Sequence, residues 1–324
     1  MIYSMLGSVR VMALVNRLAR LFHLPVVPHF MDDWPTTLFT RGELLGLGRH
    51  AVQSSIAKVL RHSRMGLCIS EEMAVEYEQR YGIPFAAFMN CVPESAFEAY
   101  QARPEGQPEG ELEFVYVGGL HLGRWASLVQ LGRILERLRP PLPPARLTVY
   151  APDRDLARHT DAFRGLACVR LAHSVASEAV PIVLQSADVV VHVESFDPDF
   201  ARYTRLSLST KLPQYLAAGR PVLGFGPGGL ASLRYLASTG AASVVGENDP
   251  DLLLRTVEQL CGDPLLRQRL AETGYAHARA HHSKRDVAER FRAHLAAAAV
   301  ALPVSLLADR GDGRSAGTVL GARP

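Results

Sequence analysis

Short apolar runs alternate with longer amphipathic stretches along most of the chain, and this alternation predicts strands and helices in turn. Runs such as DVVVHV (188–193) are apolar at nearly every position, as expected when helices cover both faces of a parallel sheet. The pattern therefore predicts a doubly wound α/β fold. The expected strands span residues 25–30, 66–70, 84–89, 113–119, 146–151, 167–171, 188–193, 221–226 and 242–246.

A stretch rich in Pro, Gly and Glu (101–112) interrupts this pattern and is typical of a linker. After it, six expected strands and their helices fill residues 113–283, which is enough for a complete domain. Residues 1–100 show three expected strands, too few to close such a sheet, so we expect a small first domain or a larger one that lacks its beginning. We expect a helix within 284–303 that crosses back to the first domain, and a disordered tail at 304–324.

Composition indicates a folded globular protein, with 48% hydrophobic and 21% charged residues. No apolar run reaches the roughly 18 residues of a membrane-spanning helix. The start of the chain carries Arg10, Arg17 and Arg20 where a signal peptide would have an uninterrupted apolar core. We therefore expect a cytoplasmic protein. The net charge of +3 is too small to indicate a nucleic-acid partner.

The cysteines stand far apart, without the paired spacing of a zinc site or a disulfide framework, so we expect reduced thiols and no metal site. Charge is uneven along the chain: eight Lys or Arg stand against three acids between Arg10 and Arg64. A basic face on helices can hold a protein to anionic lipid. An ordinary solvated helix face is the alternative, and the sequence leaves both open.

The segment VYVGGLHLGRWASL (115–128) could hold an anion, because it combines a strand, a glycine turn and a helix start. Gly118 and Gly119 would let the backbone approach a ligand, and Arg124 would supply a fixed positive charge suited to phosphate. The alternative is an ordinary strand-to-helix turn with a surface arginine.

The segment RLSLSTKLPQYLAAGRPVLGFGPGG contains a second candidate, in which Ser209 or Thr210 is expected to cap a helix. Lys211 would lie in the first turn, where a cation is unfavourable beside the helix dipole and a bound diphosphate would remove the penalty. Gln214 lies one turn further on. Glu194 follows the strand 188–193, at the edge where open α/β sheets bind ligands.

A literal dinucleotide-binding pattern is formed by Gly224, Gly226 and Gly229, with Glu247 at roughly the spacing of a ribose-binding acid. Such a fingerprint normally sits on the first strand of its domain, whereas this one follows the fifth strand after the linker. We therefore do not expect a dinucleotide oxidoreductase.

Five segments resemble the family-4-like glycosyltransferases with the GT-B architecture, in order and spacing, over about residues 20–297. They are LPVVPHFMDDWP, residues 66–97 with the turn Asn90-Cys91-Val92-Pro93, VYVGGLHLGRWASLV, STKLPQYLAAGRPVLGFGPGG and the stretch from TGAASVVG to GYAHAR. The resemblance implies two Rossmann-like domains. The family's early strands and first glycine loop have no counterpart, so we expect a first domain truncated at its N-terminus.

The resemblance implies transfer of a sugar from a UDP- or GDP-linked donor to a hydroxyl, with the anomeric configuration kept and without a cofactor. The donor-binding residues that it indicates are Gly118, Gly119, Arg124, Ser209, Thr210, Lys211, Gln214, Gly228 and Gly229. Asp32, Asp33 or His29 would face the acceptor, and Glu194 would contact the donor sugar. The family's paired glutamates are missing, because Leu206 and Gln214 stand at their positions.

The resemblance implies synthesis of a cell-surface polysaccharide or glycolipid. The basic balance between Arg10 and Arg64 favours a lipid-linked or otherwise membrane-presented acceptor at the inner membrane face. Two other functions stay open from the sequence. One is a catalytically inactive, truncated paralogue that binds a nucleotide sugar or a partner enzyme. The other is a sugar-nucleotide epimerase, which would need acid–base carboxylates that the sequence does not place.

Overall fold

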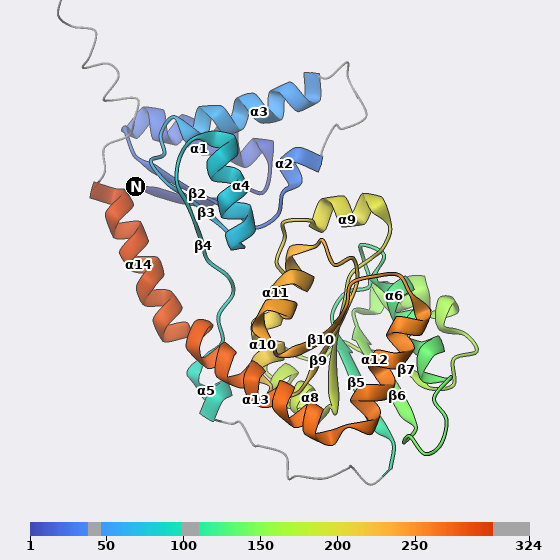
Figure 1. The fold of residues 1–324 in the computed structure, drawn as a ribbon. Helices are drawn as coiled ribbons and strands as arrows, with labels where there is room; N and C mark the ends of the chain where they lie inside the picture. Colours follow the sequence, from blue (N-terminus) through green and yellow to red (C-terminus); the bar gives the residue numbers. More distant parts are fainter. Residues whose placement is uncertain (38–46, 99–109, 301–324) are drawn as a thin grey trace, which may run out of the picture. The chain divides into compact units, whose positions relative to one another are not determined.

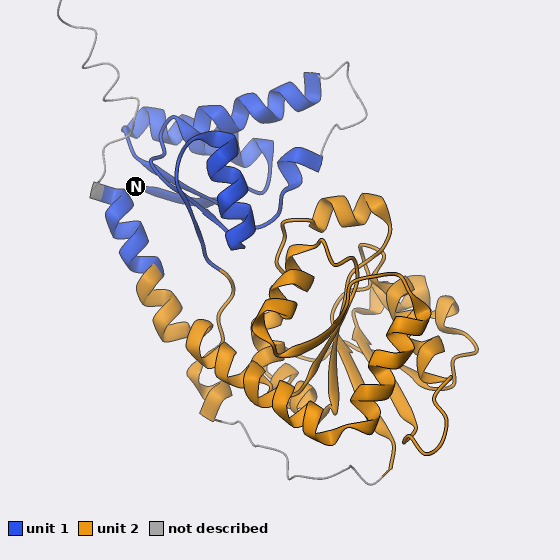
Figure 2. Cartoon of the chain, viewed as in Figure 1, with its two compact units in different colours: residues 1–88, 291–324 blue, residues 89–290 orange. Residues whose placement is uncertain are grey.

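The computed structural model describes residues 1–37, 47–98 and 110–300, which form two compact units (Figure 2). Unit 1 contains Met1–Phe88 and the part of the last helix that follows Phe291, and unit 2 contains Met89–Arg290. No helix in these described ranges is long and apolar enough to cross a membrane.

Unit 1 is a parallel four-stranded sheet in the order β1-β2-β3-β4, covered by helices (Figure 1). Its strands are β1 (Ile2–Met5), β2 (Val26–Phe30), β3 (Gly66–Cys68) and β4 (Phe85–Ala87), and its helices are α1 (Val9–Phe22), α2 (Trp34–Thr37), α3 (Leu47–Leu60) and α4 (Glu71–Tyr81). The expectation of three strands is wrong, because β1 adds a fourth. This strand lies at the sheet edge with Tyr3 and Met5 exposed, so it lacks the continuous apolar run of a buried strand.

Unit 2 is a parallel six-stranded sheet in the order β10-β9-β8-β5-β6-β7. Its strands are β5 (Leu112–Val117), β6 (Ala145–Ala151), β7 (Val169–His173), β8 (Val189–Val193), β9 (Val222–Phe225) and β10 (Ala242–Val245). All six correspond to strands expected from the sequence. The chain runs outward from β5 to β7 and then returns to β8 on the other side of β5. This is the doubly wound 3-2-1-4-5-6 order, and the prediction of a doubly wound α/β fold is confirmed.

Helices cover the sheet of unit 2 on both faces (Figure 1). The helices of unit 2 are α5 (Glu94–Glu98), α6 (Arg124–Leu135), α7 (Asp153–His159), α8 (Val180–Ser186), α9 (Pro198–Thr204), α10 (Leu212–Ala217), α11 (Ala231–Thr239), α12 (Pro250–Gly262), α13 (Pro264–His281) and the first part of α14 (Lys284–Val300). The valines of β8 are fully buried, which explains its uninterrupted apolar sequence. Because β5 and β8 are neighbours, their carboxyl ends form the switch point at which such folds bind ligands.

The core of unit 1 depends on a close approach between two adjacent strands. A Cβ atom at Gly66 in β3 would lie 2.1 Å from the ring of Phe85 in β4. Phe85 is itself buried between Phe30 and Tyr77, so its ring has little room to move. We expect Gly66→Ala to lower the free energy of unfolding of unit 1 by about 1–3 kcal/mol through overpacking.

Trp34 lies in unit 1 and Trp125 in unit 2, so urea unfolding followed by fluorescence on a Trp125→Phe background reports unit 1. Gly7→Ala is the matched control, because nothing lies within 4 Å of a Cβ atom at that position. Equal unfolding midpoints for the two variants would contradict the prediction.

Candidate functional site

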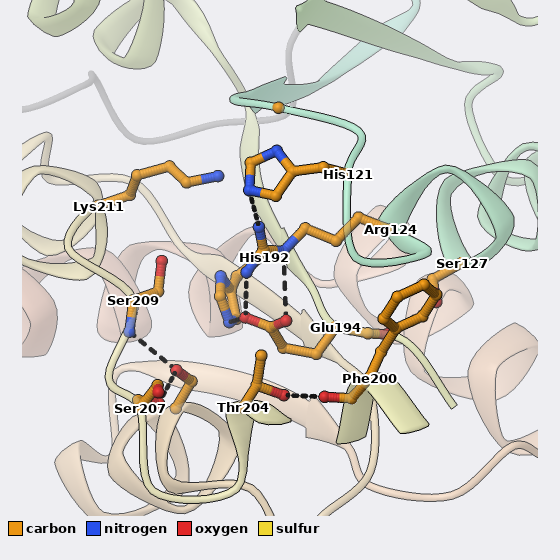
Figure 3. A network of polar contacts seen from close by, with 12 residues as sticks. His121, Arg124, Ser127, His192, Glu194, Phe200, Thr204, Ser207, Ser209 and Lys211 are labelled. Carbon is orange, nitrogen blue, oxygen red and sulfur yellow. Dashed lines mark hydrogen bonds and ion pairs between the residues drawn. The ribbon is translucent and has the colours of Figure 1, made fainter. Parts of the chain in front are cut away.

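The switch point of unit 2 brings together two segments that are 70 residues apart in the sequence (Figure 3). The loop after β5 ends at Arg124, the first residue of α6, and Glu194 directly follows β8. The Arg124 guanidinium donates from Nε to Glu194 Oε2 at 3.2 Å and from the Nη2 nitrogen to Oε1 at 3.1 Å. Both side chains are buried, with Arg124 8% and Glu194 2% exposed.

This bidentate ion pair changes the expected roles of both residues. Burial opposes the charged guanidinium, but the Glu194 carboxylate raises the pKa of Arg124 above its ordinary value. Ser127 further fixes Glu194 by donating to its carbonyl oxygen at 2.8 Å. The expected phosphate-binding cation and the expected sugar-binding carboxylate are therefore partners in one pair.

Lys211 lies beside this pair and has no such partner. Its ammonium donates to the Tyr116 hydroxyl at 3.3 Å and lies 4.8 Å from the centre of the Tyr116 ring. Within the described residues it forms no ion pair with a carboxylate. Burial, and next the charge of Arg124, lower the pKa of Lys211 to about 7. The site thus holds an amine whose positive charge is only partly stabilised by its surroundings.

The first glycine after β5 leaves room for this cation, and the second is hydrogen-bonded to its neighbour Tyr116. A Cβ atom at Gly118, where φ is +156°, would lie 2.0 Å from Lys211 Nζ. The carbonyl of Gly119 accepts a hydrogen bond from the Tyr116 hydroxyl at 2.7 Å. A hydrogen-bond chain therefore runs from Lys211 through Tyr116 to the glycine turn. A side chain at Gly118 would displace the Lys211 ammonium.

The expected capping of α10 by Ser209 or Thr210 is wrong. The N-cap residue is Lys211 itself, and no side chain caps this end of the helix. The Ser209 backbone N–H donates instead to Ser232 Oγ at 2.9 Å, and Thr210 is exposed. The Ser207 N–H donates to the Thr204 carbonyl and the Leu212 N–H to the Ser209 carbonyl, so turns occupy this segment and the helix begins later than the sequence pattern indicates.

Gln214 and the glycines after β9 lie at other positions around unit 2. Gln214 is exposed on α10 and lines a hollow of about 470 Å³ together with residues of α5 and α8. Gly228 and Gly229 are exposed in the loop that leads to α11. Gly228 packs against Gly246, and its N–H donates to the Gly246 carbonyl at 2.8 Å.

Two histidines at the switch point were missed in the sequence. His121 lies in the glycine turn, and its Nε2 is 3.4 Å from a terminal guanidinium nitrogen of Arg124. His192 in β8 is 1% exposed, with Nε2 3.5 Å from Glu194 Oε1. Burial, and then Lys211 and Arg124, hold the pKa of His192 well below its ordinary value. The available signals were a histidine inside a glycine-rich turn and a polar residue within an apolar strand.

The residues expected on the acceptor side lie in unit 1, at the carboxyl end of β2. His29 is buried in that strand beside the Tyr3 hydroxyl, which lies 2.8 Å from Nδ1, and burial lowers the pKa of His29 to about 4. Asp33 is also buried, and it accepts from the Tyr77 hydroxyl at 2.7 Å and from Arg80 at 3.0 Å. Asp32 is partly exposed, so it differs from its neighbour in having an accessible side chain.

No group of three or more His, Cys, Asp or Glu side chains is placed to hold a metal ion in the described parts of the chain. The chemistry that the switch point offers is electrostatic. It contains a fixed guanidinium, an uncompensated ammonium and an uncapped first turn of α6, all suited to an anion.

The contacts of Asp33 indicate that its main task is to stabilise unit 1. We expect Asp33→Ala to lower the free energy of unfolding by about 1–3 kcal/mol, because Tyr77 loses its acceptor and Arg80, within the described residues, keeps only Glu76 as a carboxylate partner. Asp32→Ala should stay within about 0.5 kcal/mol of the original chain, because Asp32 lies at the surface. Urea unfolding followed by Trp34 fluorescence measures both. A destabilisation by Asp32→Ala as large as that by Asp33→Ala would contradict this assignment.

Comparison with known proteins agrees with this geometry. A family model described as "Glycosyl transferase-like" matches residues 132–293, half of the chain. The structure of HepE from Anabaena in complex with UDP-glucose superposes with a TM-score of 0.67 at 11% identity, over 91% of this chain and 78% of that chain. WaaG, a glycosyltransferase involved in lipopolysaccharide biosynthesis, gives a TM-score of 0.58 at 14% identity, over 82% of this chain and 76% of that chain.

A trehalose 6-phosphate synthase from Burkholderia multivorans superposes with a TM-score of 0.61 at 15% identity, over 95% of this chain and 77% of that chain. A search of curated proteins finds no match. The structural likenesses establish the fold, and the family model establishes the relationship by sequence. The chain therefore belongs to the glycosyl transferase-like family and has the GT-B fold.

Proposed function

We propose that this chain transfers a sugar from a nucleoside diphosphate sugar to a hydroxyl acceptor and keeps the anomeric configuration. The observation that carries the proposal is the uncompensated ammonium of Lys211 beside Arg124, at the switch point of the donor unit. A diphosphate placed there would be an anionic partner for a cation that lacks one. The UDP-glucose and UDP complexes of HepE support a uridine donor, and a guanosine donor is the alternative.

In our proposal the diphosphate is both the part of the donor that the protein binds and the leaving group. Its negative charge increases as the bond to the sugar breaks, so groups fixed nearby lower the barrier by stabilising that charge. In our proposal Lys211 and Arg124 are those groups, together with the first turn of α6 that Gly123 leaves without a side-chain cap. Glu194 acts as a positioning residue, because it holds the Arg124 guanidinium in one orientation.

The remaining donor contacts that we propose are those that the family resemblance indicates. Gln214, which lies one turn from Lys211 on α10, would contact the ribose. Ser209, Thr210, Gly228 and Gly229 would contribute backbone groups from loops in the same unit. The scheme assigns charge stabilisation to the two cations and contains no metal ion.

The acceptor would bind to unit 1 near the end of β2. Asp32 has an accessible carboxylate there, whereas His29 and Asp33 are buried behind it. We therefore propose Asp32 as the group that contacts the acceptor hydroxyl, with His29 and Asp33 supporting the strand end. The role of WaaG in lipopolysaccharide biosynthesis supports an acceptor in cell-surface polysaccharide or glycolipid synthesis.

Donor binding provides a direct test of the two cations. We expect Lys211→Met to weaken UDP binding to the full-length chain about 10- to 100-fold, because it removes one charged hydrogen bond. Lys284→Met is the matched control, since Lys284 is exposed at the start of α14, and it should bind as the original chain does. Titration calorimetry measures all three proteins, and equal affinities for the two variants would contradict the proposal.

The affinity should also depend on pH. The pKa of Lys211 is about 7 in the free chain, and a bound diphosphate raises it by favouring the ammonium. The contribution of Lys211 is therefore complete below pH 7 and is lost as the pH rises through the bound-state pKa. In Lys211→Met this loss above pH 7 should disappear.

We further propose that the chain acts at an anionic membrane surface, through one face of α1. The α1 basic face consists of Arg10, Arg17 and Arg20, all exposed, and the same helix also exposes Leu14 and Leu21. The sequence of α1 contains no acidic residue. Arg61 and Arg20 both lower the pKa of His62, after burial, so basic groups beyond α1 gather at its end.

Charge complementarity favours anionic lipid as the occupant of this face, and the exposed leucines add apolar area. Each basic side chain near such a surface contributes about 1 kcal/mol. Replacing Arg10, Arg17 and Arg20 by Gln should therefore reduce binding to phosphatidylserine-containing liposomes by about two orders of magnitude at low salt. Replacing Arg255, Arg269 and Arg279, which are exposed in unit 2, removes the same charge and should have little effect.

Sedimentation with liposomes of increasing anionic content measures the difference. Binding of the original chain should rise with the anionic fraction and fall as salt is added. Equal binding of the two triple variants, or binding that ignores salt, would favour the ordinary solvated face.

A further inference from the structure

The His121 imidazole contacts the one guanidinium nitrogen of Arg124 that Glu194 does not engage. Glu194 engages Nε and one terminal nitrogen of the guanidinium, and the other terminal nitrogen lies 3.4 Å from His121 Nε2. Arginine can only donate hydrogen bonds, so Nε2 must accept this one. Each of the three guanidinium nitrogens of Arg124 is therefore engaged in the free chain.

Acceptance at Nε2 fixes the ring as the neutral tautomer with its proton on Nδ1. This N–H faces Asp155, whose Oδ2 lies 3.9 Å away. Asp155 is itself fixed in α7, because the same oxygen accepts from the Leu120 backbone N–H at 2.7 Å. Asp155 and Arg124 thus bracket the ring from opposite sides.

The charged groups that face His121 are Arg124 in α6, Asp155 in α7, Lys211 before α10 and Glu194 after β8. Burial, followed by the charge of Arg124, lowers the pKa of His121, and Lys211 lowers it further against the opposite effect of the two carboxylates. The imidazole is consequently neutral at neutral pH. Its side chain is nevertheless 59% exposed, so it has room to rotate away.

We propose that His121 is a latch on Arg124 that the donor diphosphate releases, and that the released imidazole takes up one proton from solvent and contacts the diphosphate. This inference rests on the proposed function, because it requires an anion at the switch point. An anion can accept from the N–H that His121 engages only after Nε2 has left it. The ring then lies beside an anion, which favours the imidazolium.

The turn sequence fits this movement. A Cβ atom at Gly119 would lie 2.3 Å from His121 Nδ1, so a side chain there would exclude the latched ring. The two glycines thereby have different tasks, since Gly118 makes room for Lys211 and Gly119 for His121. A turn that only bound an anion would need neither the space for Lys211 nor the space for His121.

The test is UDP binding by the full-length chain and by His121→Gln between pH 5.5 and 8.5. Calorimetry in two buffers of different ionisation enthalpy gives the number of protons taken up. Gln can still accept from Arg124 but cannot titrate, so its affinity at pH 8.5 should be close to that of the original chain. Towards pH 5.5 the UDP affinity of His121→Gln should become weaker than that of the original chain, by about tenfold for each unit by which binding raises the pKa of His121.

Because the pKa of His121 is higher in the complex, its contribution to UDP affinity is complete below the free pKa. The contribution is lost as the pH rises through the bound pKa. Ionisation of UDP and of Lys211 is common to both proteins and cancels in the difference. His173→Gln is the matched control, because His173 is an exposed histidine paired with Asp153 on the same α7 helix. It should keep the original pH dependence.

The outcomes separate the two proposals. Absence of UDP binding by the original chain would overturn the proposed function. UDP binding with the same proton uptake in His121→Gln as in the original chain would overturn the latch alone. A purely structural role of His121 would change the unfolding midpoint but leave the proton uptake intact, so thermal unfolding of the variant completes the experiment.

Discussion

The site depends on one buried ion pair, between Arg124 and Glu194. Arg124 begins α6 and Glu194 follows β8, so the pair joins the two halves of the doubly wound sheet where the chain reverses its direction of winding. Either charge alone in this position would carry a large desolvation cost. The bidentate geometry and the bond from Ser127 offset that cost and fix the guanidinium. The guanidinium that faces an anion in our proposal is held in one orientation by this pair.

The same pair explains why the charge of Lys211 depends strongly on its surroundings. Glu194 already has a partner, so it compensates the ammonium only from a distance, while Arg124 repels it. Tyr116 supplies a hydroxyl and a ring face instead of a carboxylate. These contacts orient the amine without neutralising it. An anion with two negatively charged groups therefore gains more here than it would beside two separately paired cations.

The sequence predicted the architecture of unit 2 well, because buried parallel strands such as β8 leave an unmistakable apolar run. It failed at β1, whose side chains are only partly buried at a sheet edge. Within the site, Gly118, Arg124, Glu194 and Lys211 were all selected from local patterns. Their mutual contacts were not, because Arg124 and Glu194 are 70 residues apart and a local pattern contains no information on such pairing. The helix start at Ser209 was misplaced since a turn competes with the helix there.

Neither Gln214 nor Leu206 supplies a carboxylate that could pair with Lys211. Leu206 is 2% exposed and belongs to the turn that delays α10, so no carboxylate is available from that position. Gln214, at the second position, is neutral as well. Glu194 is bound to Arg124, and Asp155 is occupied by the Leu120 N–H, so neither carboxylate neutralises Lys211. A site arranged in this way remains electropositive while it is empty, at some cost in stability. In our proposal that cost is offset when an anion binds, which is how a preorganised electrostatic site distinguishes a charged leaving group from water.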